Sequence, residues 1–250
     1  MNPIIIEKAP AIVKVRLDPI PINLPLEIRH QHELYWQEQT KTNSSLRNGE
    51  VFTITNIEQT ERELVVTVAK TDYKHYLYTL NHEDCEEPCK VIYTCAAVIT
   101  SDKKMAIGRM NRTTSTPGRL QFTGGGLDES DLEDTTFNLE KNICKEIKEE
   151  LGLDIHSPST RSFIPKFMKR KGTHDFWAII YELSVEYTAE EVHARFLTHN
   201  HDLIEMGQQP EFDDLLFVPI EKSAVEAFIQ HESSPMVDYL APILVEYTES

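Results

Sequence analysis

The chain is short of basic residues, and this shortage excludes one class of partner. It has 25 lysines and arginines against 41 aspartates and glutamates, which gives a formal net charge of −16. A field of this sign repels polyphosphate backbones instead of releasing their counterions, so we do not expect long nucleic acid as a partner. A small anionic ligand remains compatible with the charge if a divalent cation lies between the acids and the ligand.

Cysteines and long apolar runs are also scarce. The four cysteines in 250 residues do not make the disulfide framework that small secreted domains need. The N-terminal segment MNPIIIEKAP lacks the apolar core and the small-residue cleavage site of a secretory signal. No apolar run approaches the roughly 20 residues that cross a bilayer. We therefore expect a cytoplasmic protein with reduced thiols and no membrane partner.

The pattern of apolar residues, glycines and prolines predicts a mixed order of strands and helices. Strands are expected at residues 11–17, 51–57, 63–70, 91–99, 105–110, 162–168, 175–186 and 215–220. Helices are expected at residues 27–40, 135–151, 189–198, 223–230 and 237–247. This order is neither a regular βαβ repeat nor all-β, so we expect an α/β (α+β) fold, arranged as a three-layer α/β/α sandwich.

Residues 81–90, NHEDCEEPCK, are polar, acidic and contain proline, which is typical of an exposed linker. We place a boundary there, between a small mixed N-terminal region, residues 1–88, and a main domain, residues 89–250. Cys85 and Cys89 with His82 nearby could form half of a zinc site. A closed zinc site needs four ligands, however, and no second pair follows at suitable spacing, so we interpret the two cysteines as linker thiols.

The segment KEIKEELGL carries the most chemical information. Glu146, Glu149 and Glu150 stand at i, i+3 and i+4, so a helix brings the three carboxylates onto one face. Their repulsion destabilises the helix by a few tenths of a kcal/mol per pair, a cost that a bound cation offsets. Apolar residues recur at the same spacing on the opposite side and anchor the helix to a core. The alternative is an ordinary amphipathic helix that shows its acids to solvent.

Mg²⁺ prefers oxygen ligands, keeps some of its water and commonly bridges carboxylates to substrate phosphates. A diphosphate polarised in this way is open to attack by water. The glycines Gly124, Gly125 and Gly126 precede the helix and permit a close approach of backbone to phosphate. We therefore predict a Mg²⁺ site, with Mn²⁺ as the alternative metal, beside a phosphate-binding glycine turn.

These residues resemble a known family. Gly124-Gly-Gly followed by Lys145-Glu-x-x-Glu-Glu-x-Gly152 is similar to the Nudix box, Gly-x5-Glu-x7-Arg-Glu-U-x-Glu-Glu-x-Gly-U. The resemblance implies a Nudix sandwich from about residue 91 onward, with a mixed sheet between helices. It implies Glu149 and Glu150 as the main metal ligands, Glu146 as a third member of the site, Gly126 as the box glycine and Lys145 at the arginine position.

The chain departs from the box in three respects. Gly126 lies five residues farther from Gly152 than the pattern allows, so the loop before the helix carries an insertion at about residues 128–134. Phe137 falls at the first glutamate of the box, for which Glu133 or Glu140 could substitute. Lys145 replaces the arginine and cannot make the same bidentate contact with a carboxylate.

A second resemblance concerns the N-terminal region. Tyr35-Trp36, residues 43–49 followed by Val51-Phe-Thr-Ile, and Thr71-Asp72-Tyr73 are similar to the region before the box in UDP-glucose-hydrolysing Nudix proteins, which also have a lengthened box. This resemblance implies a nucleoside diphosphate sugar as substrate. A helix and a hairpin built from common residues is the alternative interpretation.

Other residues are weaker candidates. Arg109, Arg112 and Arg119 flank the loop before the glycines and are candidate phosphate ligands, or residues that keep the loop soluble. Glu211 lies where Nudix proteins sometimes place an extra acid, although a solvated loop is the favoured interpretation. We place His199 and His201 on the surface. Phe167, Phe176 and Trp177 are candidates for stacking on a base but are more typical of a core.

Three functions therefore remain open. The first is a pyrophosphatase that hydrolyses the diphosphate bond of a nucleoside diphosphate joined to another group, with a UDP-sugar as the favoured substrate. The second is an ADP-ribose or dinucleotide pyrophosphatase, and the third is a non-catalytic nucleotide-binding or regulatory Nudix domain. In each case the partner is a small nucleotide, and Nudix proteins resembling this one are monomers or homodimers.

Overall fold

The structure is a computed structural model that describes residues 3–44 and 46–249. Met1 and Asn2 of the N-terminal segment, and Ser45 within the segment 43–49 of the second resemblance, lie outside the described residues. The strands are β1 (Ile5–Lys8), β2 (Ile12–Asp18), β3 (Glu50–Gln59), β4 (Glu63–Asp72), β5 (Ile92–Ile99), β6 (Lys104–Met110), β7 (Leu120–Gln121), β8 (Thr123–Gly126), β9 (Leu132–Glu133), β10 (Thr136–Phe137), β11 (Thr160–Arg170), β12 (Trp177–Val185) and β13 (Phe212–Pro219). The helices are α1 (Leu26–Thr42), α2 (Tyr73–Asn81), the 3-10 turn η1 (Glu129–Asp131), α3 (Leu139–Leu151), α4 (Ala189–Glu205), α5 (Lys222–His231) and α6 (Leu240–Glu249).

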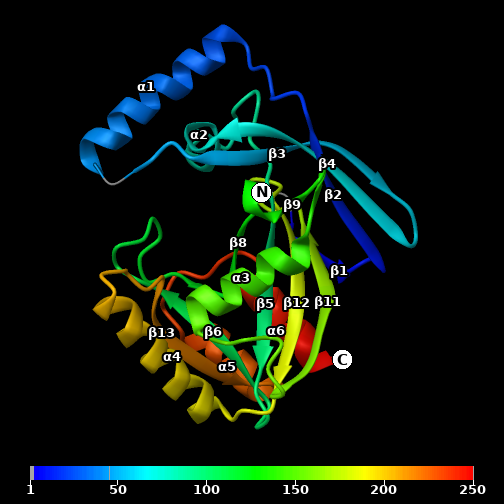
Figure 1. Ribbon diagram of the computed structural model, residues 1–250, viewed down its shortest axis with the longest axis vertical. Helices are drawn as coiled ribbons and strands as arrows, with labels where there is room; N and C mark the ends of the chain where they lie inside the picture. Colours follow the sequence, from blue (N-terminus) through cyan, green and yellow to red (C-terminus); the bar gives the residue numbers. More distant parts are fainter. Residues whose placement is uncertain (1–2, 45, 250) are drawn as a thin grey trace.

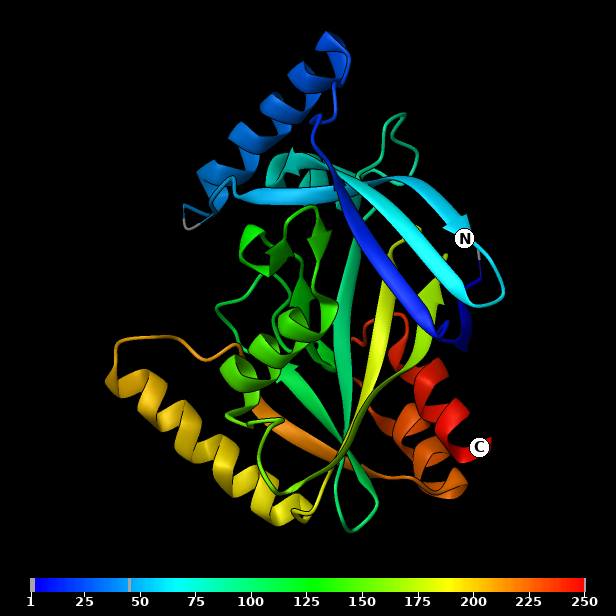
Figure 2. The same ribbon diagram turned by 45° about the vertical axis from the view of Figure 1, so that its right-hand side comes forward.

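The main sheet has the strand order β1-β11-β12-β5-β6-β13, with β7 paired to β6 and β8 paired to β5. The β12–β5 pair is parallel and its neighbours are antiparallel, so the sheet is mixed. Helices α3 and α4 lie on one face of this sheet and α5 and α6 on the other (Figures 1 and 2). The mixed α/β fold with three layers that the sequence predicts is therefore confirmed.

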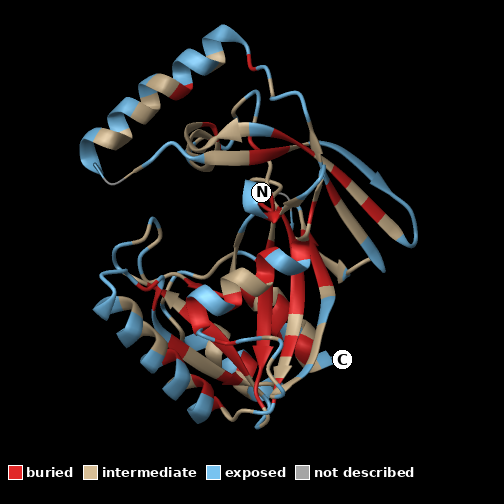
Figure 3. Cartoon of the chain, in the orientation of Figure 1, coloured by how far each residue is buried: buried red, intermediate tan, exposed pale blue. Residues whose placement is uncertain are grey.

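Side chains along the central strands point alternately to the two faces of the main sheet, and each face has its own apolar core. On β5, Ala96 and Val98 belong to the core that includes the apolar side of α3, whereas Cys95 and Ala97 belong to the core under α5 and α6. Buried residues accordingly concentrate in the central strands, and the outer faces of the helices are exposed (Figure 3). Such a strand is apolar on both faces, as expected for one covered by helices on both sides.

A second sheet, with the strand order β3-β4-β2-β10-β9, lies across the other end of the molecule from α5 and α6 (Figure 2). Its last two strands come from the insertion before α3, and β10 pairs with β2. Conversely, β1 from the N-terminal region pairs with β11 in the main sheet. Strands thus cross the predicted division between residues 1–88 and 89–250 in both sheets, and the division itself stays a prediction.

The structure corrects two local expectations. The helix predicted at 135–151 begins at Leu139, because Thr136 and Phe137 pair with β2 instead. The segment 81–90 is exposed at its acids but not throughout, because Cys89 is buried and its backbone N donates to Thr79 Oγ1 at 2.8 Å. The four cysteines are free thiols. Among the described helices, none has the length and apolar character to cross a membrane.

Candidate active site

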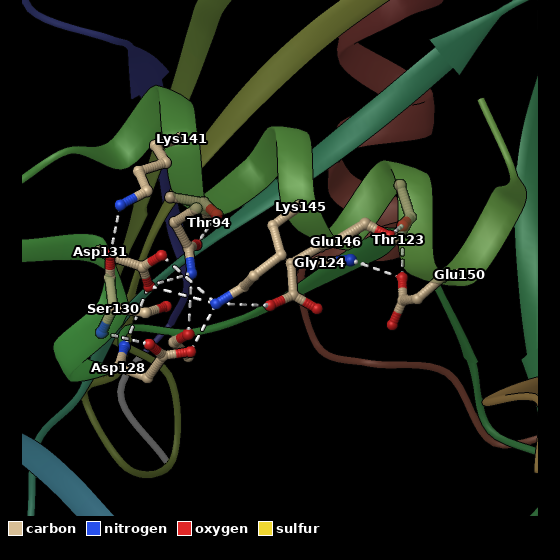
Figure 4. Close-up of polar contacts among 12 residues, drawn as sticks. Thr94, Thr123, Gly124, Asp128, Ser130, Asp131, Lys141, Lys145, Glu146 and Glu150 are labelled. Atoms are coloured by element: carbon tan, nitrogen blue, oxygen red, sulfur yellow. Dashed lines mark hydrogen bonds and ion pairs between the residues drawn. The ribbon is translucent and has the colours of Figure 1, made fainter. Parts of the chain in front are cut away.

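Helix α3 positions the acidic side chains. Asn138 begins the helix by accepting a hydrogen bond from the backbone N of Lys141 at 2.9 Å, and Gly152, at φ 66°, ends it in the left-handed region. Ile143 and Ile147 are fully buried on one side of the helix. Glu146 and Glu150 lie on the side that faces β8 and the loop after it (Figure 4).

Glu150 is the most deeply buried of the three glutamates, with 4% of its surface exposed. Its Oε2 accepts hydrogen bonds from the Thr123 hydroxyl and from the backbone N of Gly124, the latter at 2.9 Å (Figure 4). Its Oε1 is buried and receives no hydrogen bond from a donor among the described residues, and the carboxyl group of Glu211 lies in side-chain contact with that of Glu150. Burial, and then the charge of Glu211, raise the pKa of Glu150 well above its usual value. An uncompensated carboxylate oxygen of this kind is costly unless a cation meets it.

Glu146 lies one turn earlier on the same side of α3. Its side chain covers Gly125 so closely that a Cβ on Gly125 would lie 2.7 Å from its carboxyl carbon. Burial raises the pKa of Glu146 to about 7, and the charges of Glu149 and Glu211 add to this rise, while Lys145 opposes it. Glu149 is exposed. The three predicted acids thus share one side of the helix end, with one exposed and two enclosed.

At two of the three glycines, the surroundings leave no room for a side chain. Gly124 has φ +150°, and a Cβ there would lie 2.2 Å from the carbonyl oxygen of Thr94 on β5. Gly125 has no room for a side chain because of Glu146. The absence of side chains therefore brings the backbone of β8 against both buried glutamates.

Lys145 holds the insertion against α3. Its Nζ forms ion pairs with Asp128 and with Asp131, the latter at 3.3 Å, and lies 3.9 Å from Glu146 Oε1 (Figure 4). Asp131 is almost fully buried and also accepts from Asn142 Nδ2 at 2.8 Å. Asn142 in turn donates to the carbonyl of Gly126 at 3.0 Å. The lysine at the arginine position of the box therefore keeps carboxylate partners.

The two acids that pair with Lys145 are not the acids that the sequence suggested as substitutes for the first glutamate of the box. Glu133 accepts from Asn138 Nδ2 at 2.8 Å, and Glu140 is exposed in the first turn of α3. The inserted residues form the turn η1 and the hairpin β9–β10, and this turn brings Asp128 and Asp131 to Lys145. Counting positions back from the box cannot find partners that an insertion of this shape supplies.

A cavity of about 570 Å³ opens beside the glycine segment. Its wall includes Gly124, Gly125, Gly126 and Glu211, and it extends to β3, α2 and the loop between β11 and β12. The buried carboxylates of Glu146 and Glu150 lie directly behind Gly125 and Gly124. Glu211, for which a solvated loop was expected, lines the cavity. The residue is exposed at the surface, but partial burial of its carboxyl group raises its pKa.

Of the three candidate arginines, Arg119 lies on the cavity wall. Its Nη2 donates to Gln121 Oε1 at 2.6 Å, and its Nε is buried without a partner in the described structure. Arg109 instead donates to Ser234 Oγ at 2.5 Å and lies 3.6 Å from Glu232. Arg112 is exposed in the turn after β6.

The remaining candidates also have definite places. Phe167 and Trp177 are buried in the core, whereas Phe176 lies before β12 and lines the cavity. His201 is exposed. His199 is partly buried, and its Nε2 lies 2.7 Å from the carbonyl oxygen of Glu149, at the end of α3.

The donor set suits a hard cation. As the side chains stand, residues 3–44 and 46–249 contain no group of three or more His, Cys, Asp or Glu side chains arranged to hold a metal ion. Mg²⁺ does not need such a cage, because it is commonly held by one or two carboxylates, water and substrate phosphates. The unpartnered Oε1 of Glu150 and the nearby Glu146 supply oxygen ligands of the required type.

No protein-family model matches the chain, and no curated protein matches it in sequence. Solved structures similar to it include DR0079 from Deinococcus radiodurans (16% identity, TM-score 0.43, 62% of this chain and 82% of that chain) and the MutT protein from Methanosarcina mazei Go1 (14%, 0.41, 66% and 97%). A third is a bifunctional NMN adenylyltransferase/ADP ribose pyrophosphatase from Francisella tularensis, complexed with AMP and a Mn ion (10%, 0.44, 70% and 47%).

Sequence reasoning missed several residues of this site. Thr123, Asp131 and Asn142 fix the acids and the loop, yet only Thr123 adjoins a motif residue in the sequence. Tyr73 and Tyr76 on α2 line the cavity from the N-terminal region. Tyr73 was named in the second resemblance, but no helix was predicted there, so the sequence did not place Tyr73 or Tyr76 beside the glycine segment.

Proposed function

We propose that this protein is a Mg²⁺-dependent Nudix-type pyrophosphatase that hydrolyses the diphosphate bond of a nucleoside diphosphate joined to another group. The observation that carries the proposal is the buried, unpartnered Oε1 of Glu150, beside a glycine segment that lines a cavity of about 570 Å³. A buried carboxylate oxygen without a donor calls for a cation. A cation next to exposed backbone in a cavity is a suitable place for a diphosphate.

Glu150 and Glu146, with Glu149 from the solvent side, would hold Mg²⁺, or Mn²⁺ as the alternative. What the bound ion supplies is neutralisation of the diphosphate charge and activation of the attacking water. Gly124, Gly125 and Gly126 allow the phosphates to approach, and Arg119 presents guanidinium donors from the cavity wall. Lys145 positions the loop through Asp128 and Asp131 and does not need to touch substrate.

A UDP-sugar is the first substrate candidate, on the resemblance of the N-terminal region, and ADP-ribose is the second. Both carry the same diphosphate and differ in base and in the attached sugar. The decisive assay measures product release from UDP-sugars, ADP-ribose and dinucleoside polyphosphates, each with and without Mg²⁺ and at neutral and alkaline pH. Activity on none of them would leave a nucleotide-binding role in place of the enzyme.

Glu150→Gln tests the site itself. We expect Glu150→Gln and Glu149→Gln each to lower kcat/KM at least roughly 100-fold, because removing even an outer residue of a metal site commonly costs 10–100-fold. Glu150→Gln removes a charge that is buried without a full set of partners, so the metal-free variant should be at least as thermally stable as the parent.

Metal binding gives a second readout. Mg²⁺ should raise the melting temperature of the parent protein, because a ligand that binds only the folded state stabilises it, and this rise should be absent in Glu150→Gln. Glu140→Gln is the matched control, since Glu140 is an exposed acid in the first turn of the same helix. Full activity in both Glu149→Gln and Glu150→Gln would refute the assignment.

A further inference from the structure

One wall of the cavity carries a row of aromatic side chains from two segments far apart in the sequence. Tyr73 and Tyr76 come from α2, and His174 and Phe176 come from the loop between β11 and β12. The rings of Tyr73 and Tyr76 lie 5.7 Å apart, those of Tyr76 and Phe176 are stacked at 5.5 Å, and those of His174 and Phe176 lie 5.3 Å apart. Each of the four is only partly buried, so the row is not core packing.

The aromatic row, defined as Tyr73, Tyr76, Phe176 and His174, lies within electrostatic reach of the phosphate side of the cavity. Burial raises the pKa of Tyr76 to about 12, and the positive charge of Arg119 opposes this rise. The same guanidinium opposes the rise that burial causes in the pKa of Glu211. Arg119, the four residues of the row and Glu211 line the same cavity, so one ligand in it can contact both the row and the acidic edge of the site.

The row is also held in place before any ligand binds. The side chain of Lys169 is 2% exposed, and its Nζ donates to the carbonyl of Phe176 at 2.9 Å and pairs with Asp238 at 2.9 Å. Lys90 pairs with Asp175 at 2.9 Å, which ties the loop before β12 to the start of β5. A wall fixed in this way loses little conformational entropy when a ligand packs against it.

We propose that the aromatic row binds the planar base of the substrate, so that α2 of the N-terminal region selects nucleotides over other diphosphates. The inference rests on the proposed function, because it assigns one end of the same substrate. Partly exposed rings provide a stacking surface for a heterocycle, since every base has a π face. Arg119 then lies on the path from the base to the diphosphate, where a guanidinium suits phosphate oxygens.

The test measures equilibrium binding, because binding requires no turnover. UMP, AMP and ribose 5-phosphate are titrated into the metal-free full-length protein in a calorimeter. We expect the two nucleotides to bind at least roughly tenfold more tightly than ribose 5-phosphate, and Tyr76→Ala or Phe176→Ala to weaken nucleotide binding roughly tenfold, as the removal of one stacking ring does. Ribose 5-phosphate binding should change little in either variant.

Tyr76→Phe is the matched control, because it keeps the ring and should keep the affinity for nucleotides. Phe176→Leu, which retains apolar volume but no π face, covers the case in which Phe176→Ala does not fold, as judged by its thermal melt. Equal affinity of the parent for UMP, AMP and ribose 5-phosphate would overturn the inference. So would an equal loss of affinity in Tyr76→Phe and Tyr76→Ala.

The same titration separates the inference from the proposed function. Glu150→Gln should keep the parent's preference for UMP and AMP over ribose 5-phosphate, while losing hydrolysis. A parent protein that hydrolyses no diphosphate but prefers nucleotides to ribose 5-phosphate would refute the enzymatic proposal and leave the base site standing. A parent that hydrolyses UDP-sugars yet shows no ring-dependent nucleotide binding would do the reverse.

Discussion

Lys145 connects helix α3 to the insertion before it through two carboxylates. Phe137, at the position that the resemblance to the Nudix box gives to a glutamate, is buried and pairs with β2. Asp131, from the insertion, occupies the buried position facing Lys145 instead, and Asp128 pairs with the same ammonium near the surface. A lysine, unlike an arginine, reaches several acids as a compact point charge and does not need a bidentate fit. Lys145 is therefore the charged partner of both acids of the insertion.

Lys145→Met should destabilise the fold. Asp131 would lose its charged partner while remaining almost fully buried, and a hydrogen bond to a charged group is worth roughly 1.5–3 kcal/mol. For a chain of this size, we expect the melting temperature to fall by roughly 5 °C in a calorimetric scan.

Two further variants check the cause of that loss. Lys145→Arg should retain most of the stability, because it keeps the charge beside Asp131. Lys148→Met, on the exposed side of the same helix, should change the free energy of unfolding by no more than about 0.5 kcal/mol. If Lys145→Met melts at the temperature of the parent, the pairing with Asp131 is not what holds the insertion.

At the scale of single elements, α3 and α2 differ in what their sequences reveal. Ile143, Ile147 and Leu151 recur every four residues and are all buried, so local spacing was sufficient to predict α3 and its acidic side. Helix α2 buries His75 and Thr79, two polar residues, and shows no apolar stripe that a pattern could detect. Its contribution to the cavity was therefore invisible in the sequence.

The same limit applies to elements that depend on distant partners. The hairpin β9–β10 exists because β10 pairs with β2, far earlier in the chain, and no local pattern encodes such a pairing. The aromatic row likewise joins α2 to the loop before β12. Sequence reasoning located the acids and the glycines, which are neighbours in one motif. It did not locate the cavity wall, which only the tertiary fold brings together.

Helix α1 is attached to α2 through a stack of two histidines, which makes its docking sensitive to pH. His32 on α1 is 2% exposed, and its ring stacks on that of His75 at 4.9 Å. Burial, and then the charge of His75, lower the pKa of His32 to about 4, against the opposing effect of Asp72. Burial also lowers the pKa of His75. Both rings are therefore neutral in the docked state near pH 7.

Because both rings are neutral in the docked state, protonation of His32 weakens the docking of α1 on α2. In the undocked helix, His32 takes up a proton near its ordinary pKa of about 6.5, whereas the docked form resists protonation down to about pH 4. Docking is therefore fully stable above pH 6.5 and weakens as the pH falls toward 4, by up to about 3 kcal/mol. Below that range the loss is complete.

Trp36 on α1 reports this change, because its ring lies 6.2 Å from that of Tyr73 on α2. With Trp177→Phe as background, Trp36 emission should shift toward that of an exposed indole between pH 6.5 and 4, and the shift should reverse on return to pH 7. His32→Phe keeps the ring but removes its proton site, so most of the shift should disappear. An identical shift in both proteins would assign the pH dependence to other groups.

At the scale of the whole molecule, the two sheets exchange strands across the predicted boundary. Residues 1–88 give β1 to the main sheet, and the later part of the chain gives β9 and β10 to the second sheet. One core cluster contains Val15, Phe52 and Leu64 from the N-terminal region together with the apolar side of α3. The rings of Phe52 and Phe137 touch across the boundary at 4.8 Å. Shared strands and a shared core favour cooperative unfolding of the entire chain.

We therefore expect one thermal transition for the full chain, with far-UV circular dichroism and tryptophan fluorescence changing together. A fragment of residues 89–250 should melt at least roughly 10 °C lower or aggregate, because it exposes the edge of β11 and the buried side chain of Phe137. Exposing one large apolar side chain costs roughly 1.5–3 kcal/mol, a substantial part of a total stability of roughly 5–15 kcal/mol. A fragment that melts at the temperature of the full chain would instead establish residues 89–250 as an independent domain. In that case the aromatic residues of α2 would belong to an accessory region that residues 89–250 do not need for their stability.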